Sequence, residues 1–264
     1  MNEQMTKISY QINYTRRLIG TALGFSLFGA GGIILCFTLI PLVHLFSTDK
    51  VKGSRRVRFI IGYVFSIYLK ILNIFGVLKI KSETLEAVKK CQGVLVICNH
   101  PSLLDVVIIM AHLKDIQCVV KNNLWTNPFI GGVVRAAGYI RNDLAPEEFL
   151  KNCKRSLTQG CNIIIFPEGT RSTPGEPLKL QRGMSNLALA IRADIQTLTL
   201  DCAPISLTKK DKWYKIPVKK IIFNLKVGPY IQVANYEDDK PRSLRVRALT
   251  KDIQHFYNKH LGYE

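Results

Sequence analysis

The chain of 264 residues is long enough for one sizeable folded domain and an additional segment. Lysine and arginine outnumber aspartate and glutamate by 37 to 19, so the formal net charge is +18 and the surface should attract anions. No signature of a common nucleic-acid-binding module and no metal-ligand spacing is present, so we expect neither nucleic acid nor a metal ion as a partner. Lipid headgroups or a phosphorylated substrate remain as candidates.

An uncharged apolar stretch lies near the N-terminus. Residues 19–46 contain no Lys, Arg, Asp or Glu, and they exceed the ~20 residues that a spanning helix requires. Pro41, His44 and a basic patch follow, which favours a retained membrane segment over a cleaved signal peptide. Since Gly29–Gly32 and Pro41 can interrupt a helix, a single span and a re-entrant pair both remain open.

A second apolar stretch, Phe59–Val77, is interrupted by Lys70 and Asn73 and is typical of an amphipathic helix lying in the membrane interface. We therefore expect residues 1–79 to form a membrane anchor with an interfacial helix and residues 80–264 to form a separate domain. Basic residues flank the first apolar stretch on both sides, with a slight excess that favours a cytoplasmic location for the C-terminal side.

The second part of the chain alternates short apolar runs with helical patterns, which is typical of an α/β domain. We predict a mixed sheet flanked by helices, preceded by the membrane-embedded helical segment. The expected strands are Val94–Cys98, Gln117–Val120, Gly138–Ile140, Ile163–Phe166, Leu198–Ile205 and Ile221–Val227, and the expected helices are Leu103–His112, Pro146–Gln159, Gly183–Arg192 and Ser243–Leu261.

Two other features carry weaker predictions. The seven cysteines are scattered without a CxxC pair, so we expect small core residues in a reducing compartment rather than a disulfide framework. The segment KKDKWYKIPVKK at residues 209–220 is equally compatible with a loop resting on anionic lipid and with a solvated loop.

Residues 98–105 read CNHPSLLD and place His100 and Asp105 five positions apart. On a regular helix or strand this spacing would leave the two side chains on different faces. Pro101 favours an extended His100 and suits a first helical turn, so we predict strand, turn and helix, with Asp105 pointing back at the imidazole. A carboxylate on one ring nitrogen fixes the tautomer and leaves the other nitrogen as a general base.

A structural interpretation competes with this one. Ser102 to Asp105 also fits a helix capping box, in which the carboxylate satisfies backbone N–H groups. These residues alone leave both interpretations open.

A second polar cluster follows the apolar residues of IIIFPEGTRS, residues 163–172. We expect a buried strand that presents Glu168, Gly169, Thr170 and Arg171 at its carboxyl end, where open α/β sheets bind ligands. Gly169 allows close approach of the backbone, and Arg171 offers a planar fork for phosphate or carboxylate. A plain surface turn is the alternative for this segment.

Taken together, NHPSLLD and FPEGTRS resemble the glycerolipid acyltransferase family, the bacterial 1-acyl-sn-glycerol-3-phosphate acyltransferases and related lysophospholipid acyltransferases. The resemblance covers residues 80–235. The segment VKNNLWTNPFIGGVVRAAGYIRND at residues 120–143 is similar to the block between the two motifs, and LQRGMSNLALA and Ala203-Pro204-Ile205 are similar to the blocks that follow.

The resemblance implies that His100, held by Asp105, deprotonates a lysophospholipid hydroxyl, most simply the sn-2 hydroxyl of lysophosphatidic acid. The acyl donor would be acyl-CoA or acyl carrier protein, with no metal and no resident cofactor. It assigns acceptor binding to Glu168, Gly169, Thr170 and Arg171, with Lys121 and Arg141 contributing. It also implies a bacterial cytoplasmic membrane with the catalytic domain on the cytoplasmic side and in contact with anionic lipid.

One departure from the family pattern concerns the acceptor. Relatives that use lysophosphatidic acid commonly carry an arginine where this chain has Leu144. Either Arg141 takes its place or the acceptor is a different lipid or glycolipid, and a non-catalytic lipid-binding relative is the remaining alternative. We expect no chemistry from His44, His112, His255 or His260.

Overall fold

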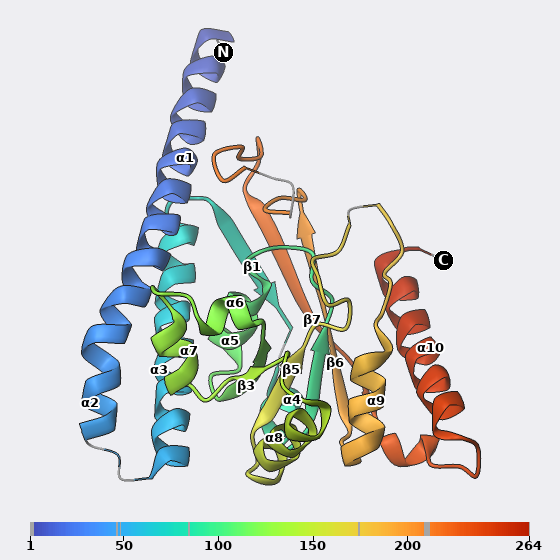
Figure 1. Ribbon diagram of the computed structural model, residues 1–264. Coiled ribbons are helices and arrows are strands. Elements are labelled where there is room, and N and C mark those ends of the chain that lie inside the picture. The colour runs from blue at the N-terminus through green and yellow to red at the C-terminus, as the bar shows by residue number, and fades with distance from the viewer. Residues whose placement is uncertain are drawn as a thin grey trace.

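A seven-stranded sheet lies at the centre of the computed structural model, which describes residues 3–45, 47, 49–83, 85–173, 175–208 and 212–263. Its strand order is β1-β7-β6-β2-β5-β3-β4 (Figure 1). The strands are β1 (Leu78–Ser82), β2 (Leu95–Cys98), β3 (Ile116–Val120), β4 (Ile140–Arg141), β5 (Asn162–Ile165), β6 (Ile195–Ala203) and β7 (Ile221–Ile231).

The sheet is mixed, as predicted. Strands β6, β2, β5, β3 and β4 are parallel to one another, whereas β7 is antiparallel to β6 and β1 is parallel to β7. The carboxyl ends of β2, β5, β3 and β4 therefore lie along one edge of the sheet. That edge is where an α/β sheet of this kind presents ligand-binding groups.

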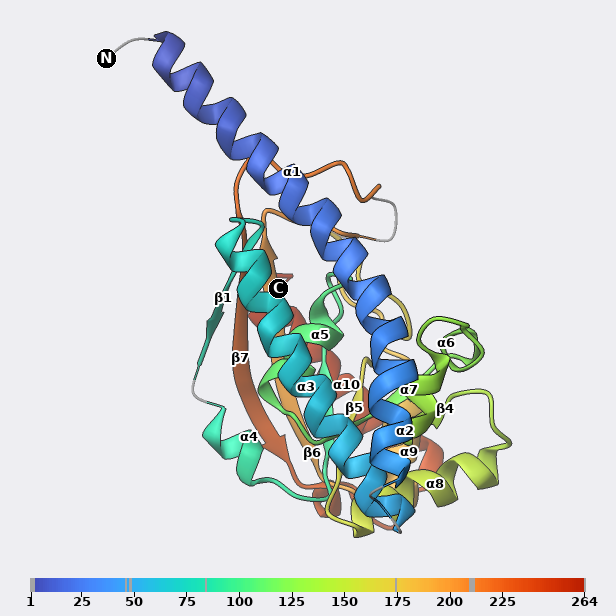
Figure 2. The same ribbon diagram turned by 90° about the vertical axis from the view of Figure 1, so that its left-hand side faces the viewer.

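Helices cover both faces of the sheet and close two apolar cores (Figures 1 and 2). The first core lies under α3 (Lys50–Ile74), α4 (Glu86–Lys90), α5 (Asp105–His112) and α7 (Gly131–Ala136), and the second under α8 (Pro146–Thr158), α9 (Arg182–Ile191) and α10 (Arg242–Leu261). Short elements α6 (Asn122–Trp125) and a 3₁₀ turn (Val233–Tyr236) complete the fold. All seven cysteines are free, five of them are buried, and four of these five belong to the two cores.

The N-terminal helix continues through its glycines. Helix α1 (Glu3–Ile34) includes Gly29–Gly32 without a break and passes through a π-helical turn (Leu35–Leu39) into α2 (Ile40–Leu45). Pro41 has no N–H to donate. The residue before it, Ile40, donates its N–H to the Leu35 carbonyl, which is the hydrogen bond of a π-helical turn. Most apolar side chains of α1 and α2 remain exposed on the surface of the fold.

Helix α3 has two different faces. One face is buried in the first core, where α3 packs against α5, and it consists of Val57, Ile61, Leu69 and Leu72. Residues 50–74 therefore share a core with the strands that follow residue 79, where a division between two domains was predicted. The opposite face exposes Phe59, Tyr63, Ile67 and Ile74. Helices α1 with α2 and α3 are each long and apolar enough to cross a membrane.

A buried arginine joins α3 to the rest of the domain. The Arg58 side chain is 2% exposed, and its guanidinium donates to Asp115 Oδ1 at 2.9 Å and to the Ala137 carbonyl at 3.0 Å. Arg55 approaches the other oxygen of the same carboxylate at 2.6 Å but is largely exposed. The buried charge is therefore paired and hydrogen-bonded, as a buried charge must be.

The basic loop contacts α1. Residues 209–211 of the predicted loop lie outside the described residues. Beyond them, the exposed Trp213 ring lies 6.2 Å from the Phe25 ring, and the Pro217 carbonyl accepts a hydrogen bond from the buried Arg17 at 2.6 Å. The loop thus packs against α1 at Arg17 and Phe25.

Candidate active site

The end of β2 fixes where the first motif begins. All four residues of β2 are buried, and the Asn99 side chain that follows both donates to the Leu200 carbonyl and accepts the Leu200 N–H, each at 2.8 Å. This pair of bonds attaches the strand end to β6. His100 is therefore held at the edge of the sheet, and α5 begins only five residues later, at Asp105.

His100 and Asp105 meet as predicted, because the chain turns between β2 and α5. His100 Nδ1 lies 2.8 Å from Asp105 Oδ2, and the exposed side-chain fractions are 19% for the histidine and 0% for the aspartate. The same oxygen accepts the Ser102 N–H at 2.7 Å. Asp105 therefore orients the imidazole and also satisfies a backbone donor before the helix, so the two interpretations of this motif hold together.

The environment of Asp105 shifts the pKa of its carboxyl group in opposing directions. Burial raises the pKa of Asp105, while the hydrogen bonds from His100 and Ser102 and the charge of Arg171 oppose that shift. Because an ionised carboxylate only accepts hydrogen bonds, an ionised Asp105 requires a neutral His100 to carry its proton on Nδ1 and leaves the Nε2 lone pair free. This is the arrangement that a general base needs.

The second loop encloses the imidazole from another side. Phe166, directly after β5, stacks on the His100 ring with centroids 4.3 Å apart. The buried Glu168 accepts the His100 N–H and the Ser172 hydroxyl, each at 2.9 Å on Oε1, and the Ser172 N–H donates to the His100 carbonyl at 2.8 Å. The loops after β2 and β5 are thus hydrogen-bonded into one unit.

The remaining residues of this loop differ in orientation. Gly169 adopts a positive φ of 69°, which favours glycine, and together with Thr170 it is exposed at the sheet edge. Arg171 is half-buried and donates from Nη1 to the Leu207 carbonyl at 2.9 Å. Among the predicted binding cations Lys121, Arg141 and Arg171, Arg171 is the one whose charge lowers the pKa of Asp105.

Lys121 and Arg141 lie on the same edge but farther from His100. Neighbouring strands are ~4.8 Å apart, which places the ends of β3 and β4 roughly 10 and 14 Å from β2. Lys121 is exposed after β3, and Arg141 at the end of β4 forms a two-bond pair with Asp143 at 2.9 and 2.7 Å. Leu144 packs against the second apolar core and presents no cation.

Comparison with known proteins identifies the domain. A family model described as Acyltransferase matches residues 79–203. Residues 79–203 are therefore similar to an acyltransferase domain. Proteins named 1-acyl-sn-glycerol-3-phosphate acyltransferase are similar to it. One from Helicobacter pylori is 35% identical over 112 residues, which are 40% of this chain and 47% of that protein. One from Pseudomonas aeruginosa is 26% identical over 155 residues, which are 57% of each chain.

The matched stretch spans about half the length of these curated relatives. The acyltransferase fold extends further, because the crystal structure of the 1-acyl-sn-glycerophosphate acyltransferase PlsC from Thermotoga maritima superposes with a TM-score of 0.68. That superposition covers 92% of this chain and 96% of the other at 19% identity. The predicted family and fold class are therefore confirmed.

Several residues of the candidate active site were not assigned from the sequence. Phe166 was expected only as the end of a strand, and Asn99 and Ser172 were given no role. The available signal was position: each lies beside a motif residue at a strand end. Among the described residues, no group of three or more His, Cys, Asp or Glu side chains is placed to hold a metal ion.

Proposed function

We propose that this protein is a membrane-associated O-acyltransferase that transfers a fatty acyl group from a thioester to the sn-2 hydroxyl of 1-acyl-sn-glycerol-3-phosphate. The observation that carries the proposal is the 2.8 Å contact between His100 Nδ1 and the fully buried Asp105 at an open edge of the sheet. The thioester is acyl-CoA or acyl carrier protein.

The proposed reaction begins with proton removal by His100. Nε2 takes the proton from the acceptor hydroxyl, whose oxygen attacks the thioester carbonyl carbon. The resulting imidazolium is stabilised by Asp105 across the Nδ1 hydrogen bond. When the tetrahedral intermediate collapses, the carbon–sulfur bond breaks and the thiolate receives the proton from Nε2. The two substrates and the histidine account for every atom, so the proposed chemistry requires no metal or resident cofactor.

The acceptor phosphate is assigned to Arg171. It is half-buried, and within the described residues one of its guanidinium nitrogens is used, in the hydrogen bond to Leu207. The exposed Gly169 and Thr170 lie next to it on the open side of the loop. Glu168 contributes indirectly, since it holds the His100 loop through the backbone N–H.

One observation favours a different acceptor as the second candidate. The predicted substitute for a phosphate-binding arginine, Arg141, already has a carboxylate partner in Asp143, and Leu144 is apolar. At the β4 end of the sheet edge, positions 141 and 144 therefore offer no unpaired cation to a phosphate group. An acceptor with an uncharged sugar headgroup would fit that end better than a glycerol phosphate.

We also propose a location at the cytoplasmic face of a bacterial membrane, which the net charge and the apolar helices support. The net charge of +18 matches an anionic bilayer, and α1 and α3 expose apolar side chains that water would not favour. The acceptor and both helices would then share one lipid phase. A non-catalytic lipid-binding role is disfavoured, because the pair of His100 and Asp105 retains the geometry of a base.

The proposal is tested with an acceptor panel. Membranes containing the wild-type protein receive radiolabelled acyl-CoA or acyl carrier protein together with lysophosphatidic acid, other lysophospholipids or a glycolipid, and products are separated by thin-layer chromatography. New diacyl product from lysophosphatidic acid supports the first candidate, and product from the glycolipid alone supports the second. No product with any acceptor and either donor contradicts acyl transfer.

A further inference from the structure

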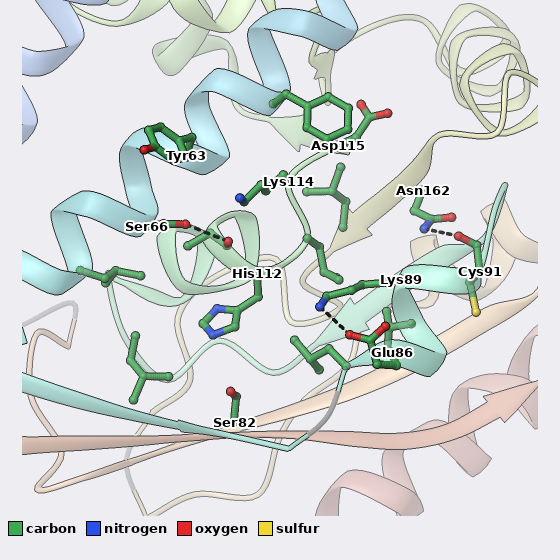
Figure 3. Close-up of a pocket in the computed structure, with 18 of the residues that line it drawn as sticks. Tyr63, Ser66, Ser82, Glu86, Lys89, Cys91, His112, Lys114, Asp115 and Asn162 are labelled. Carbon is green, nitrogen blue, oxygen red and sulfur yellow. Dashed lines mark hydrogen bonds and ion pairs between the residues drawn. The ribbon is translucent and has the colours of Figure 1, made fainter.

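A cavity of about 1210 Å³ lies between α3, α4, β1 and the C-terminal end of α5. This volume is above the usual range for small-molecule sites, roughly 300 to 1,000 Å³. Figure 3 shows His112 and Lys114 between α3 and β1, with Ser82 pointing toward them from β1. None of these side chains belongs to the candidate active site.

The cavity and the candidate active site lie at opposite ends of α5. Asp105 begins this helix and His112 ends it, and eight residues at ~1.5 Å each span roughly 12 Å. The cavity is also lined by Ile116 at the start of β3 and Asn162 at the start of β5, whereas His100 and Glu168 follow the carboxyl ends of their strands. A ligand in this cavity would therefore not touch the catalytic pair.

The walls of the cavity combine an apolar interior with a charged rim. The interior is formed by buried leucine and valine side chains: Leu69, Leu78, Leu85, Val88 and Leu113. The rim carries the cations Arg55, Lys70, Lys89 and Lys114. Such a combination suits an amphiphile whose chain enters the apolar part while an anionic group remains at the rim.

Most of the acidic groups at the rim are already neutralised. Asp115 is paired with both Arg55 and Arg58, and Glu86 is paired with Lys89 at 2.8 Å. Glu83 is the remaining carboxylate, and its Oε2 accepts the Val227 N–H at 3.3 Å.

Two lysines and a histidine are left for a ligand. Within the part of the chain that the structure describes, neither Lys70 nor Lys114 forms an ion pair, and the Lys114 ammonium lies 5.5 Å from the centre of the Tyr63 ring. His112 uses Nδ1 on the Ile108 carbonyl at 2.7 Å, which leaves Nε2 available.

Helix α3 carries both a cation of this rim and exposed aromatic side chains. The same helix that supplies Lys70 exposes the aromatic side chains Phe59 and Tyr63, both of which line the cavity. Aromatic and basic residues together are typical of the membrane interface. We propose that the cavity binds an anionic phospholipid of the bilayer, with an acyl chain against the leucines and the phosphate at Lys70 and Lys114.

The test uses a phosphatidylglycerol that carries a photoreactive diazirine in its acyl chain, with the matching phosphatidylcholine as the neutral probe. The full chain with His100→Ala is placed in phosphatidylcholine nanodiscs, irradiated, digested and mapped by mass spectrometry. Turnover is not needed, so the labelling result stays separate from the outcome of the acyl-transfer assay. We expect phosphatidylglycerol to label peptides from α3, β1 and α4 more strongly than phosphatidylcholine does.

Variants test the two parts of the cavity. Lys70→Glu with Lys114→Glu should lower labelling of these peptides roughly tenfold, because two charge-assisted contacts to phosphate are lost. Lys251→Glu with Lys259→Glu on α10 makes the same change in net charge and should leave labelling unchanged. Ser82→Trp, which places a large side chain in the cavity, should lower labelling without any change in charge. Equal labelling by both probes, or labelling that survives the rim variants and Ser82→Trp, would overturn the proposal.

Discussion

The Glu168 carboxylate accepts the backbone N–H of His100 at 2.9 Å, so the loop after β5 holds the loop that carries the proposed base. Ser172 completes the link with its own N–H on the His100 carbonyl at 2.8 Å. This relationship explains why two motifs that are distant in sequence occur together, since each loop orients the other. It also gives Glu168 a positioning role that is distinct from contact with the acceptor.

Glu168→Gln keeps a hydrogen-bond acceptor for His100 but removes a buried charge. Burial raises the pKa of Glu168 above its usual value of 4.5. A raised pKa in the folded protein contributes stability at pH values below the ordinary pKa, and this contribution is lost as the pH rises through the folded pKa. The Tm of the wild type should therefore fall relative to that of Glu168→Gln between pH 4.5 and neutrality. Parallel Tm curves across that range would contradict this account.

Asp105→Asn tests the role of the aspartate in chemistry against its role at the helix start. An amide facing Nδ1 favours the wrong tautomer, so kcat should fall by roughly 10²- to 10⁴-fold. The stability cost should stay near 1 kcal/mol, as for a helix cap. Ser102→Ala is the matched control, because it removes the hydroxyl that accepts the Leu104 N–H at 3.1 Å while leaving the bond to Asp105 intact. It should lower Tm and leave most of kcat.

Arg171 and Arg141 should differ in their effect on the acceptor. Arg171→Ala should raise the KM for lysophosphatidic acid by roughly tenfold to a hundredfold, because a charge-assisted contact to phosphate is lost. Arg141→Ala should change KM little, since that guanidinium is paired with Asp143. Steady-state kinetics with varied acceptor concentration provide the measurement. A reversed ranking would place the phosphate at the end of β4.

Arg58 should be important for stability although it lies outside the catalytic site. Arg58→Ala leaves the Asp115 carboxylate with only an exposed partner and should cost about 3–5 kcal/mol, the usual result of breaking a buried pair. Arg55→Ala removes the exposed partner of the same carboxylate and should cost at most about 1 kcal/mol. Chemical unfolding of both variants in detergent compares them directly. Equal costs would mean that α3 is not a structural part of the α/β core.

The strands and long helices of the domain could be predicted because their apolar patterns are strong and local. β2 is a run of buried residues and β5 is buried at its two central residues, and α8 and α10 begin within one residue of the predicted positions. Strand β1 was not predicted, because LKIKS is short and exposes its lysines. The burial of Arg58 and its ion pair could also not be predicted from the sequence, because Asp115 is distant along the chain and meets Arg58 only in the folded structure.

Within the site, the meeting of His100 and Asp105 followed from the proline and the spacing. The stacking of Phe166 and the inward direction of Glu168 could not be derived in the same way, because both depend on β2 and β5 being neighbours in the sheet. Strand order is a long-range property that short motifs do not encode. The cavity near His112 was missed for the same reason, since its walls come from six elements.

The most direct test of the central claim compares wild-type protein with His100→Ala in one assay, with radiolabelled acyl-CoA or acyl carrier protein as donor and lysophosphatidic acid as acceptor. Circular dichroism and membrane flotation first establish that the variant folds and binds membranes like the wild type. The account predicts diacyl product from the wild type and at least a ~10³-fold lower rate from the variant, because the variant lacks the imidazole that is assigned as the base. Comparable product from both proteins would contradict the assignment of His100.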